Sequence, residues 1–154
     1  MSETIVTVSW ERGDQDFCGN EYSRGHTWTF DGGLSVPASA SPDIVSLLWS
    51  VAENVDLEEA FVASISSCHM LFFLSLAAKR KIVVDRYADS AVGFMEQRED
   101  GKIAMTKVIL RPEARYFGDA QPSRELLEKL HHRAHELCFI ANSVNAEIVT
   151  EVIA

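Results

Sequence analysis

The sequence predicts an α+β fold in which two long helices pack against a mostly antiparallel sheet. Two segments with helical periodicity lie far apart in the chain, and strand-like segments come before, between and after them. Glycine-containing turns join neighbouring strand-like segments, as in antiparallel hairpins. No repeat, low-complexity segment or linker interrupts the 154 residues, so we expect a single domain over residues 1–154.

The first part of the chain predicts strands. Residues 4–10 alternate and are rich in β-branched side chains, which is typical of a strand. Residues 26–30 and 34–36 flank the turn Asp31–Gly33, where glycine supplies the positive φ that tight turns need. We therefore expect a hairpin, followed by a small-residue loop over residues 37–42.

A long helix is expected over residues 57–79. Asp56 precedes it and can accept hydrogen bonds from its unpaired N–H groups. Glu58 and Glu59 lie in the first turn and basic residues at the end, which complements the helix dipole. The segment before this helix, residues 43–51, fits either a short helix or an irregular cover.

The middle of this helix is apolar, since residues 60–78 contain no Asp, Glu, Lys or Arg. At about 1.5 Å per residue such a segment could cross a bilayer, but it includes four serines and a histidine. A helix that is apolar on nearly all sides belongs in the centre of a structure. We therefore expect a buried central helix and no membrane span. A chain this short can hardly wrap such a helix, so we expect a partner subunit to cover it.

The second half of the chain predicts another hairpin, because two long alternating segments, residues 82–97 and 102–111, flank the turn Glu99–Gly101. Residues 112–119 continue as an extended segment.

A second helix is expected to start at Pro122-Ser123, and residues 146–153 predict a final strand. Apolar residues recur along this helix at helical spacing, at Leu126, Leu127, Leu130, Ala134, Leu137 and Cys138.

The net charge of −9 bears on partners and location. Because phosphates are bound by clustered Lys and Arg, we expect neither nucleic acid nor an anionic membrane surface as a partner. Residues 1–6 lack the basic region and apolar core of a signal peptide. Three cysteines do not make a secreted disulfide framework. We therefore expect a cytoplasmic protein, in which a cysteine pair is more often redox-active than structural.

Cys68 and Cys138 lie in the two helix-like segments and can form a peroxide-reducing thiol and its resolving partner. A thiol attacks a peroxide only as the thiolate, and the pKa of an unperturbed cysteine is about 8.5. A buried Cys68 therefore needs a nearby cation, and arginine stays charged even when desolvated. Arg24, just before the first hairpin strand, is the candidate, and Glu58 could hold it in an ion pair.

Three segments of the chain form one pattern. Glu58 to Ala63, followed by Ser67-Cys68, is an acidic, small-residue-rich helix that leads to a cysteine. Residues 22–26 place an arginine just before the first hairpin, and residues 138–144 open with the second cysteine. In this order the segments resemble the OsmC/Ohr family, the osmotically inducible and organic-hydroperoxide-resistance thiol peroxidases. Phe139 departs from the pattern, since many members have proline there.

The resemblance implies an intertwined homodimer with the two cysteine helices at its centre and active sites at the subunit interface. It implies reduction of organic hydroperoxides, with Cys68 as the peroxidatic cysteine, Cys138 as the resolving cysteine, and Arg24 paired with Glu58. The implied reductant is a small or protein-bound dithiol, such as a lipoylated protein. From the residues themselves we expect no cofactor, since no glycine-rich phosphate-binding loop stands out.

Other interpretations of these residues stay open. Cys68 and Cys138 also fit structural positions in a non-catalytic dimer of the same fold that binds a small apolar ligand. His131, His135 and Cys138 share a helix face and could ligate zinc. However, the sequence has no HExxH motif and no evident fourth ligand, so we expect no metal site.

Overall fold

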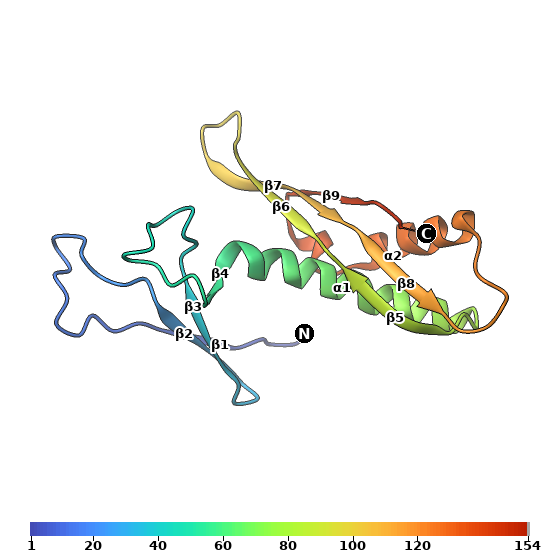
Figure 1. Ribbon diagram of the computed structural model, residues 1–154, viewed down its shortest axis with the longest axis horizontal. Helices are drawn as coiled ribbons and strands as arrows, with labels where there is room; N and C mark the ends of the chain where they lie inside the picture. The colour runs from blue at the N-terminus through green and yellow to red at the C-terminus, as the bar shows by residue number, and fades with distance from the viewer. Residues whose placement is uncertain (154) are drawn as a thin grey trace. The chain divides into compact units, whose positions relative to one another are not determined.

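The computed structural model describes residues 1–153. They form two compact units, Met1–Ala60 and Phe61–Ala154. Strands β1 to β4 come first, followed by helix α1, strands β5 to β8, helix α2, a short 3-10 helix η1 and strand β9 (Figure 1). The expected α+β fold, with two helices and mostly antiparallel strand pairs, is confirmed.

The first unit contains a four-stranded sheet. Its strands follow the order β1 (Val6–Ser9), β2 (His26–Phe30), β3 (Ser35–Ser39) and β4 (Val55–Asp56). The pairs β1–β2 and β2–β3 are antiparallel, whereas β3–β4 is parallel. The first hairpin is where it was expected: Gly33 has a φ of 95° and donates its N–H to the Phe30 carbonyl at 2.9 Å.

Strand β3 runs through Ser39, so the loop expected over residues 37–42 is wrong in its first half. Ala38 and Ser39 are fully buried and pair with β4. The Ser39 hydroxyl also accepts a hydrogen bond from Val51 N at 3.0 Å. Pro37 fits within the strand because β4 pairs only with the two residues after it, which leaves Pro37 without a neighbouring strand on that side.

Residues 43–51 form turns and not a short helix. The N–H groups of Ile44 and Trp49 donate to the carbonyls of Ser41 and Ser46, at 3.0 and 2.9 Å. The segment is therefore the irregular cover that the sequence left as one of two alternatives.

Helix α1 (Leu57–Lys79) has the predicted bounds. A reciprocal cap begins it: Asp56 Oδ1 accepts from Glu59 N, and Glu59 Oε1 accepts from Asp56 N, each at 2.8 Å. By length and composition alone, α1 could cross a membrane. It is instead a core helix, because a buried stripe recurring every four residues packs against α2 and β7. The stripe consists of Ile65, His69, Phe73 and Ala77.

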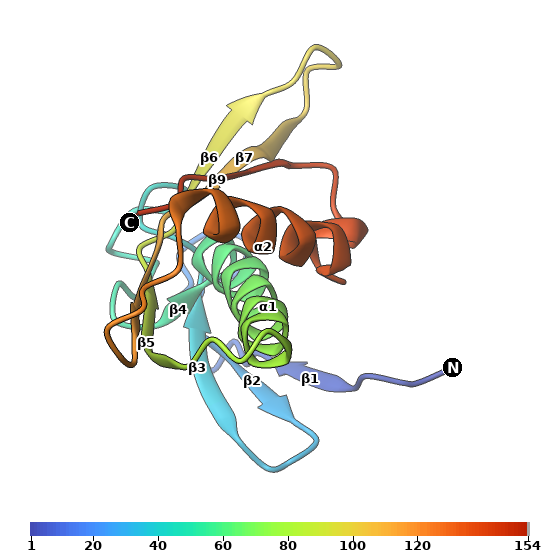
Figure 2. The same ribbon diagram turned by 90° about the vertical axis from the view of Figure 1, so that its right-hand side faces the viewer.

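The second unit holds the remaining strands in two sheets. Strand β5 (Val84–Asp89) pairs antiparallel with β8 (Pro112–Tyr116). Strand β7 (Ile103–Leu110) pairs antiparallel with β6 (Val92–Gln97) and parallel with β9 (Glu147–Thr150). Both helices lie on the same side of these strands (Figure 2).

The long strand expected over residues 82–97 is two strands, β5 and β6. The chain changes partner between them, since β5 pairs with β8 and β6 with β7. Asp89 ends β5, and its Oδ1 accepts the N–H of Arg111 at 2.6 Å, at the corresponding break between β7 and β8. The alternation of polar and apolar residues along the sequence does not show where a strand changes its partner.

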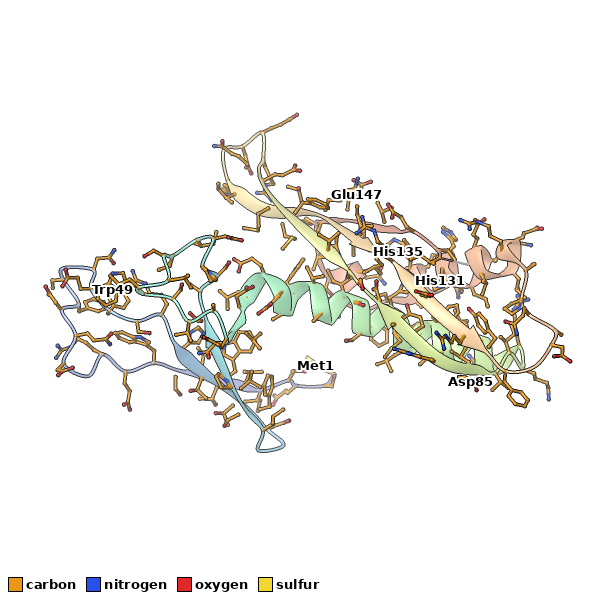
Figure 3. All side chains as sticks on the ribbon, in the orientation of Figure 1. Met1, Trp49, Asp85, His131, His135 and Glu147 are labelled. Carbon is orange, nitrogen blue, oxygen red and sulfur yellow. The ribbon has the colours of Figure 1, made fainter. Side chains whose placement is uncertain are left out.

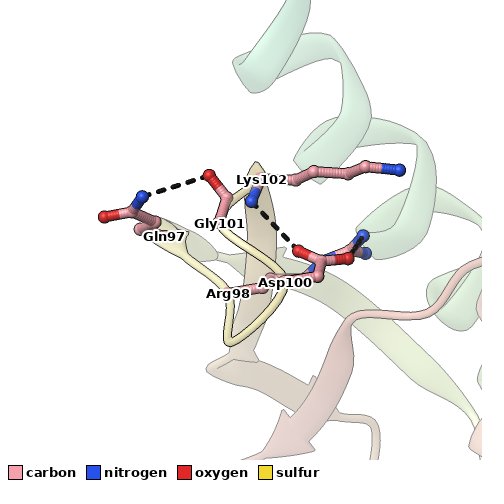
Figure 4. A network of polar contacts seen from close by, with 5 residues as sticks. All are labelled: Gln97, Arg98, Asp100, Gly101 and Lys102. Carbon is pink, nitrogen blue, oxygen red and sulfur yellow. Dashed lines mark hydrogen bonds and ion pairs between the residues drawn. The ribbon is translucent and has the colours of Figure 1, made fainter.

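The second predicted hairpin is confirmed as the β6–β7 turn, in which Gly101 has a φ of 83° (Figure 4). Asp100 Oδ2 forms an ion pair with Arg98 Nη2 at 2.7 Å, and Asp100 Oδ1 accepts a hydrogen bond from Lys102 N at 3.0 Å. Gln97 Nε2 donates to the Gly101 carbonyl at 3.1 Å.

Helix α2 (Arg124–Leu137) is capped by the Ser123 hydroxyl, which accepts from Leu126 N at 3.1 Å. It ends one residue before Cys138, which the sequence had placed on the helix. The backbone of Cys138 is extended (φ −63°, ψ 112°), and its N–H donates to the His135 carbonyl. The 3-10 helix η1 (Ala141–Ser143) follows.

The expected packing of α1 against α2 is confirmed by a cluster of Phe73, Leu127, Leu130 and Ala134. The final strand is shorter than the 146–153 expected, although Ile153 adds an isolated bridge to Glu113.

Candidate active site

The two cysteines meet where α1 passes the end of α2. Cys68 is half-buried at the edge of the buried stripe of α1, whereas Cys138 is buried. Phe72 lies four residues after Cys68, on the same face of the helix. Its ring meets Phe139 edge-to-face, with centroids 5.0 Å apart. Phe139 therefore packs against the cysteine-bearing face of α1.

Both thiols are free, and they lie close enough to interact. Burial, together with the neighbouring Cys68 thiol, raises the pKa of the Cys138 thiol to about 11. Backbone N–H groups oppose this: Ala141 N donates to Cys138 Sγ at 3.4 Å. Cys138 is therefore a protonated thiol at neutral pH, held beside Cys68.

Arg24 belongs to the first unit, where its own loop holds its side chain. The guanidinium donates to the Tyr22 carbonyl at 2.5 Å and to Asn20 Oδ1 at 2.8 Å. It also lies over the Tyr22 ring, 3.7 Å from the centroid. Tyr22 in turn stacks on Phe17 and meets Trp10 edge-on. The arginine thus rests on an aromatic cluster next to the first hairpin.

Glu58 lies in the first turn of α1 and is half-buried. Its Oε2 is buried and has no hydrogen-bond partner among the residues that the structure describes. Across residues 1–153, no ion pair joins Glu58 to Arg24. The structure thus brings Cys68 and Cys138 together but does not pair Arg24 with Glu58.

A buried pair of histidines lies beside the cysteines, and the sequence alone did not reveal it. His69 Nε2 and His131 Nδ1 are 2.9 Å apart, and Phe73 stacks on His131 with centroids 4.1 Å apart. Burial lowers the pKa of each imidazole to about 4. The one sequence signal was the position of His69 in the i, i+4 stripe of α1.

The histidines of α2 do not form the zinc site that was weighed from their spacing. His131 faces His69 and Cys138 faces Cys68, so two of the three side chains have other partners. Within residues 1–153, no group of three His, Cys, Asp or Glu side chains is placed to hold a metal ion.

Comparison with known proteins identifies the family to which this chain is related. A family model described as OsmC-like protein matches residues 56–153, while no curated protein matches the chain. An OsmC-like protein of unknown function from Vibrio cholerae is 55% identical, with 99% of this chain and 100% of that chain covered and a TM-score of 0.97.

More distant solved structures share the fold. The organic hydroperoxide resistance protein OhrB of Bacillus subtilis is 19% identical, with 99% and 98% coverage and a TM-score of 0.70. An organic hydroperoxide resistance protein from Elizabethkingia anophelis is 17% identical, with 99% and 94% coverage and a TM-score of 0.72. The family model and the Vibrio cholerae relative together establish that this chain belongs to the OsmC-like family.

Proposed function

We propose that this protein is a cysteine-based peroxidase that reduces organic hydroperoxides to alcohols. The observation that carries the proposal is the placement of Cys68 next to Cys138, at the contact between α1 and the end of α2. Family membership agrees with it, and two structures of the same fold are named organic hydroperoxide resistance proteins.

The proposed reaction has three steps. The Cys68 thiolate attacks the distal peroxide oxygen, the O–O bond breaks, and an alcohol leaves while Cys68 becomes a sulfenic acid. The Cys138 thiol condenses with this sulfenic acid, which forms a disulfide and releases water. An external dithiol then reduces the disulfide by exchange and becomes a disulfide itself. A lipoylated protein has the chemistry for this last step.

The two cysteines have different environments that suit these different roles. Cys68 is half-buried and therefore partly accessible to a substrate, while Cys138 is buried and kept protonated by the rise in its pKa. A protonated Cys138 does not compete for the peroxide, because only a thiolate is a strong nucleophile. The N–H of Ala141 is placed to stabilise sulfur charge when Cys138 reacts.

Arg24 and Glu58 complete the proposed site. In this proposal Arg24 stabilises the Cys68 thiolate and polarises the bound peroxide, while Glu58 anchors the guanidinium. The buried and unpaired Oε2 of Glu58 is the acceptor that such an anchor needs. Arg24 would have to exchange its bonds to Asn20 and Tyr22 for this ion pair.

We further propose that the protein works as a cytoplasmic homodimer. The face of α1 away from its buried stripe is exposed, with Leu71 62% accessible. Small residues flank Leu71 at helical spacing, so another helix could approach closely. The exposed residues of this face are Ser64, Ser67, Leu71, Ser75 and Ala78.

The test uses reduced protein treated with one equivalent of cumene hydroperoxide, followed by intact-mass measurement and peptide mapping. We expect the wild type to lose two hydrogens and to yield a peptide linking Cys68 to Cys138. The Cys138→Ser variant should stop at the Cys68 sulfenic acid, with one added oxygen. The matched control is Cys18→Ser, which removes an exposed thiol and should behave as the wild type.

Comparable peroxide turnover by a Cys68→Ser protein would refute the proposal. Free thiols after treatment would instead favour a non-catalytic dimer of this fold that binds a small apolar ligand.

A further inference from the structure

A cleft of about 440 Å³ lies between α2 and β9, and neither Cys68 nor Cys138 lines it. One wall is one face of α2, whose residues recur at helical spacing. The other wall is β9 and its continuation, where Ile148, Thr150 and Val152 alternate on one face. Figure 3 labels two of the α2 residues, His131 and His135. The helix wall consists of Arg124, Glu128, His131, His132 and His135, and the strand wall of Ile148, Thr150, Glu151 and Val152.

The carboxylates at this cleft are already paired with cations. Glu128 Oε1 lies 3.0 Å from Arg124 Nε, and Glu151 Oε2 lies 3.1 Å from Arg111 Nε. Arg124 also donates to the Val152 carbonyl at 3.4 Å and so links the two walls at one end. The cleft is therefore close to neutral, although the whole chain carries a charge of −9.

The hydrogen bond between His69 and His131 determines which nitrogen of His131 faces the cleft. Nδ1 of His131 bonds Nε2 of His69, which leaves Nε2 of His131 for the cleft. Nδ1 of His69 is buried without a partner among the described residues. If His131 were the donor, this orphan nitrogen would carry a proton; if His69 is the donor, it is only an acceptor.

Buried N–H groups without partners are rarer in proteins than unsatisfied acceptors. We therefore assign His69 as the donor, which places the proton of neutral His131 on its cleft-facing Nε2. The same reasoning applies to His135, whose Nδ1 is buried without a partner in residues 1–153. Its proton also belongs on Nε2.

Two imidazole N–H donors, four residues apart on one helix face, thus serve the same cleft. A metal ion needs an unprotonated ring nitrogen, so these donors favour an acceptor ligand over a cation. A phosphate would need free cationic groups, but the guanidinium groups of Arg124 and Arg111 are engaged in ion pairs. Ile148 and Val152 add an apolar surface on the opposite wall.

We propose that this cleft binds a short aliphatic monocarboxylate. Its two oxygens accept hydrogen bonds from Nε2–H of His131 and of His135, and its chain lies on Ile148 and Val152. An apolar wall with a few convergent polar groups is the usual composition of a small-molecule site. This site does not depend on the chemistry of the cysteines, and a Cys68→Ser protein should bind the ligand equally well.

The test is a titration of the full-length protein with hexanoate. Calorimetry measures the affinity, and long-range 1H–15N correlation spectra report the ring nitrogens of each histidine. We expect protonated Nε2 in His131 and His135 before addition, and shifts at both of these nitrogens on binding. His135→Leu should weaken binding about tenfold or more, the effect of losing one hydrogen bond to a charged group.

Two variants make the test specific. His135→Gln keeps an N–H donor at the same distance along the side chain and should retain affinity within about threefold. Lys129→Ala removes an exposed residue of α2 that pairs with Glu125 and does not line the cleft, and it should bind as the wild type does. If His135→Leu fails to fold, the His131 Nε2 shift in the wild type decides the question.

The proposal is overturned if hexanoate does not bind, if it binds without shifting these two nitrogens, or if His135→Leu retains full affinity. It is equally overturned if inorganic phosphate or zinc binds the cleft more tightly than hexanoate, or if the spectra show unprotonated Nε2 atoms.

Discussion

His69 and His131 are the most unusual residues of this core. Their ring planes are within 3° of parallel with centroids 5.2 Å apart, and Phe73 continues the stack. Burial is the main cause of the lowered pKa of each ring, and a positive charge on a neighbouring histidine would lower it further. The negative charge of Asp89 opposes this at His69. Both imidazoles are thus neutral at pH 7 and act as packed, hydrogen-bonded core residues.

This pair predicts a loss of stability in mild acid. The folded pKa of each ring is about 4, against 6.5 in the unfolded chain. As the pH falls from 6.5 to 4, the unfolded state binds protons that the folded state does not, so the free energy of unfolding falls. One imidazole contributes at most ~3 kcal/mol to this loss. The two contributions do not add, because the rings share one hydrogen bond and repel each other when charged.

Urea unfolding at pH 7 and pH 4.5 measures the effect. A double variant, His69→Leu with His131→Phe, should lose much of the pH dependence, while the control His132→Leu should keep it. If the free energy of unfolding fell by the same amount between pH 7 and pH 4.5 in the wild type and in the double variant, this account would be contradicted.

At the scale of elements, β6, β7 and α1 pack closely around Gly93. A Cβ atom added to Gly93 on β6 would lie 2.6 Å from both Met105 Sδ on β7 and Val62 Cγ2 on α1. No side chain fits there without displacing its neighbours. Gly93 therefore lets the helix approach the hairpin closely.

We expect Gly93→Ala to lower the free energy of unfolding by ~1–3 kcal/mol, the usual cost of overpacking a core. The matched control is Gly32→Ala in the first hairpin turn, where an added Cβ meets nothing within 4 Å. That variant should change stability by less than ~0.5 kcal/mol, as surface substitutions do. Equal urea midpoints for both variants would show that β6 and α1 separate more easily than the structure indicates.

At the scale of the whole molecule, the exposed face of α1 bears on the oligomeric state. A helix that carries no charge from Ala60 to Ala78 and still exposes Leu71 leaves apolar surface in water. A second subunit that covers this face would remove that cost, which is the physical reason for the proposed dimer.

Leu71→Asp should therefore convert a dimer into a monomer, because dimerisation would bury an unpaired carboxylate. Ile103→Asp, at the start of β7, makes the same change at a residue of similar exposure, 66%, and should stay dimeric. Light scattering coupled to size-exclusion chromatography gives the mass of each variant. A Leu71→Asp protein that keeps the wild-type dimer mass would place the interface elsewhere.

The sequence by itself determined the features that depend on contacts between residues close together in the chain. The bounds of α1 follow from a cap between Asp56 and Glu59, three residues apart. Both hairpin turns follow from glycines with positive φ. The approach of Cys68 to Cys138 followed from the family pattern and not from local rules. The single domain over residues 1–154 stays a prediction.

Only the tertiary structure decided what depends on residues distant in the chain. The break after Asp89 arises because β5 and β6 take different partners, and β3 extends because β4 pairs with its end. Sixty-two positions separate His69 from His131, so no local pattern could pair them. The same hydrogen bond sets which imidazole nitrogen faces the cleft beside β9. Local patterns reveal capping and turns because these interactions join nearby residues, whereas partner choice and burial depend on the packing of the whole chain.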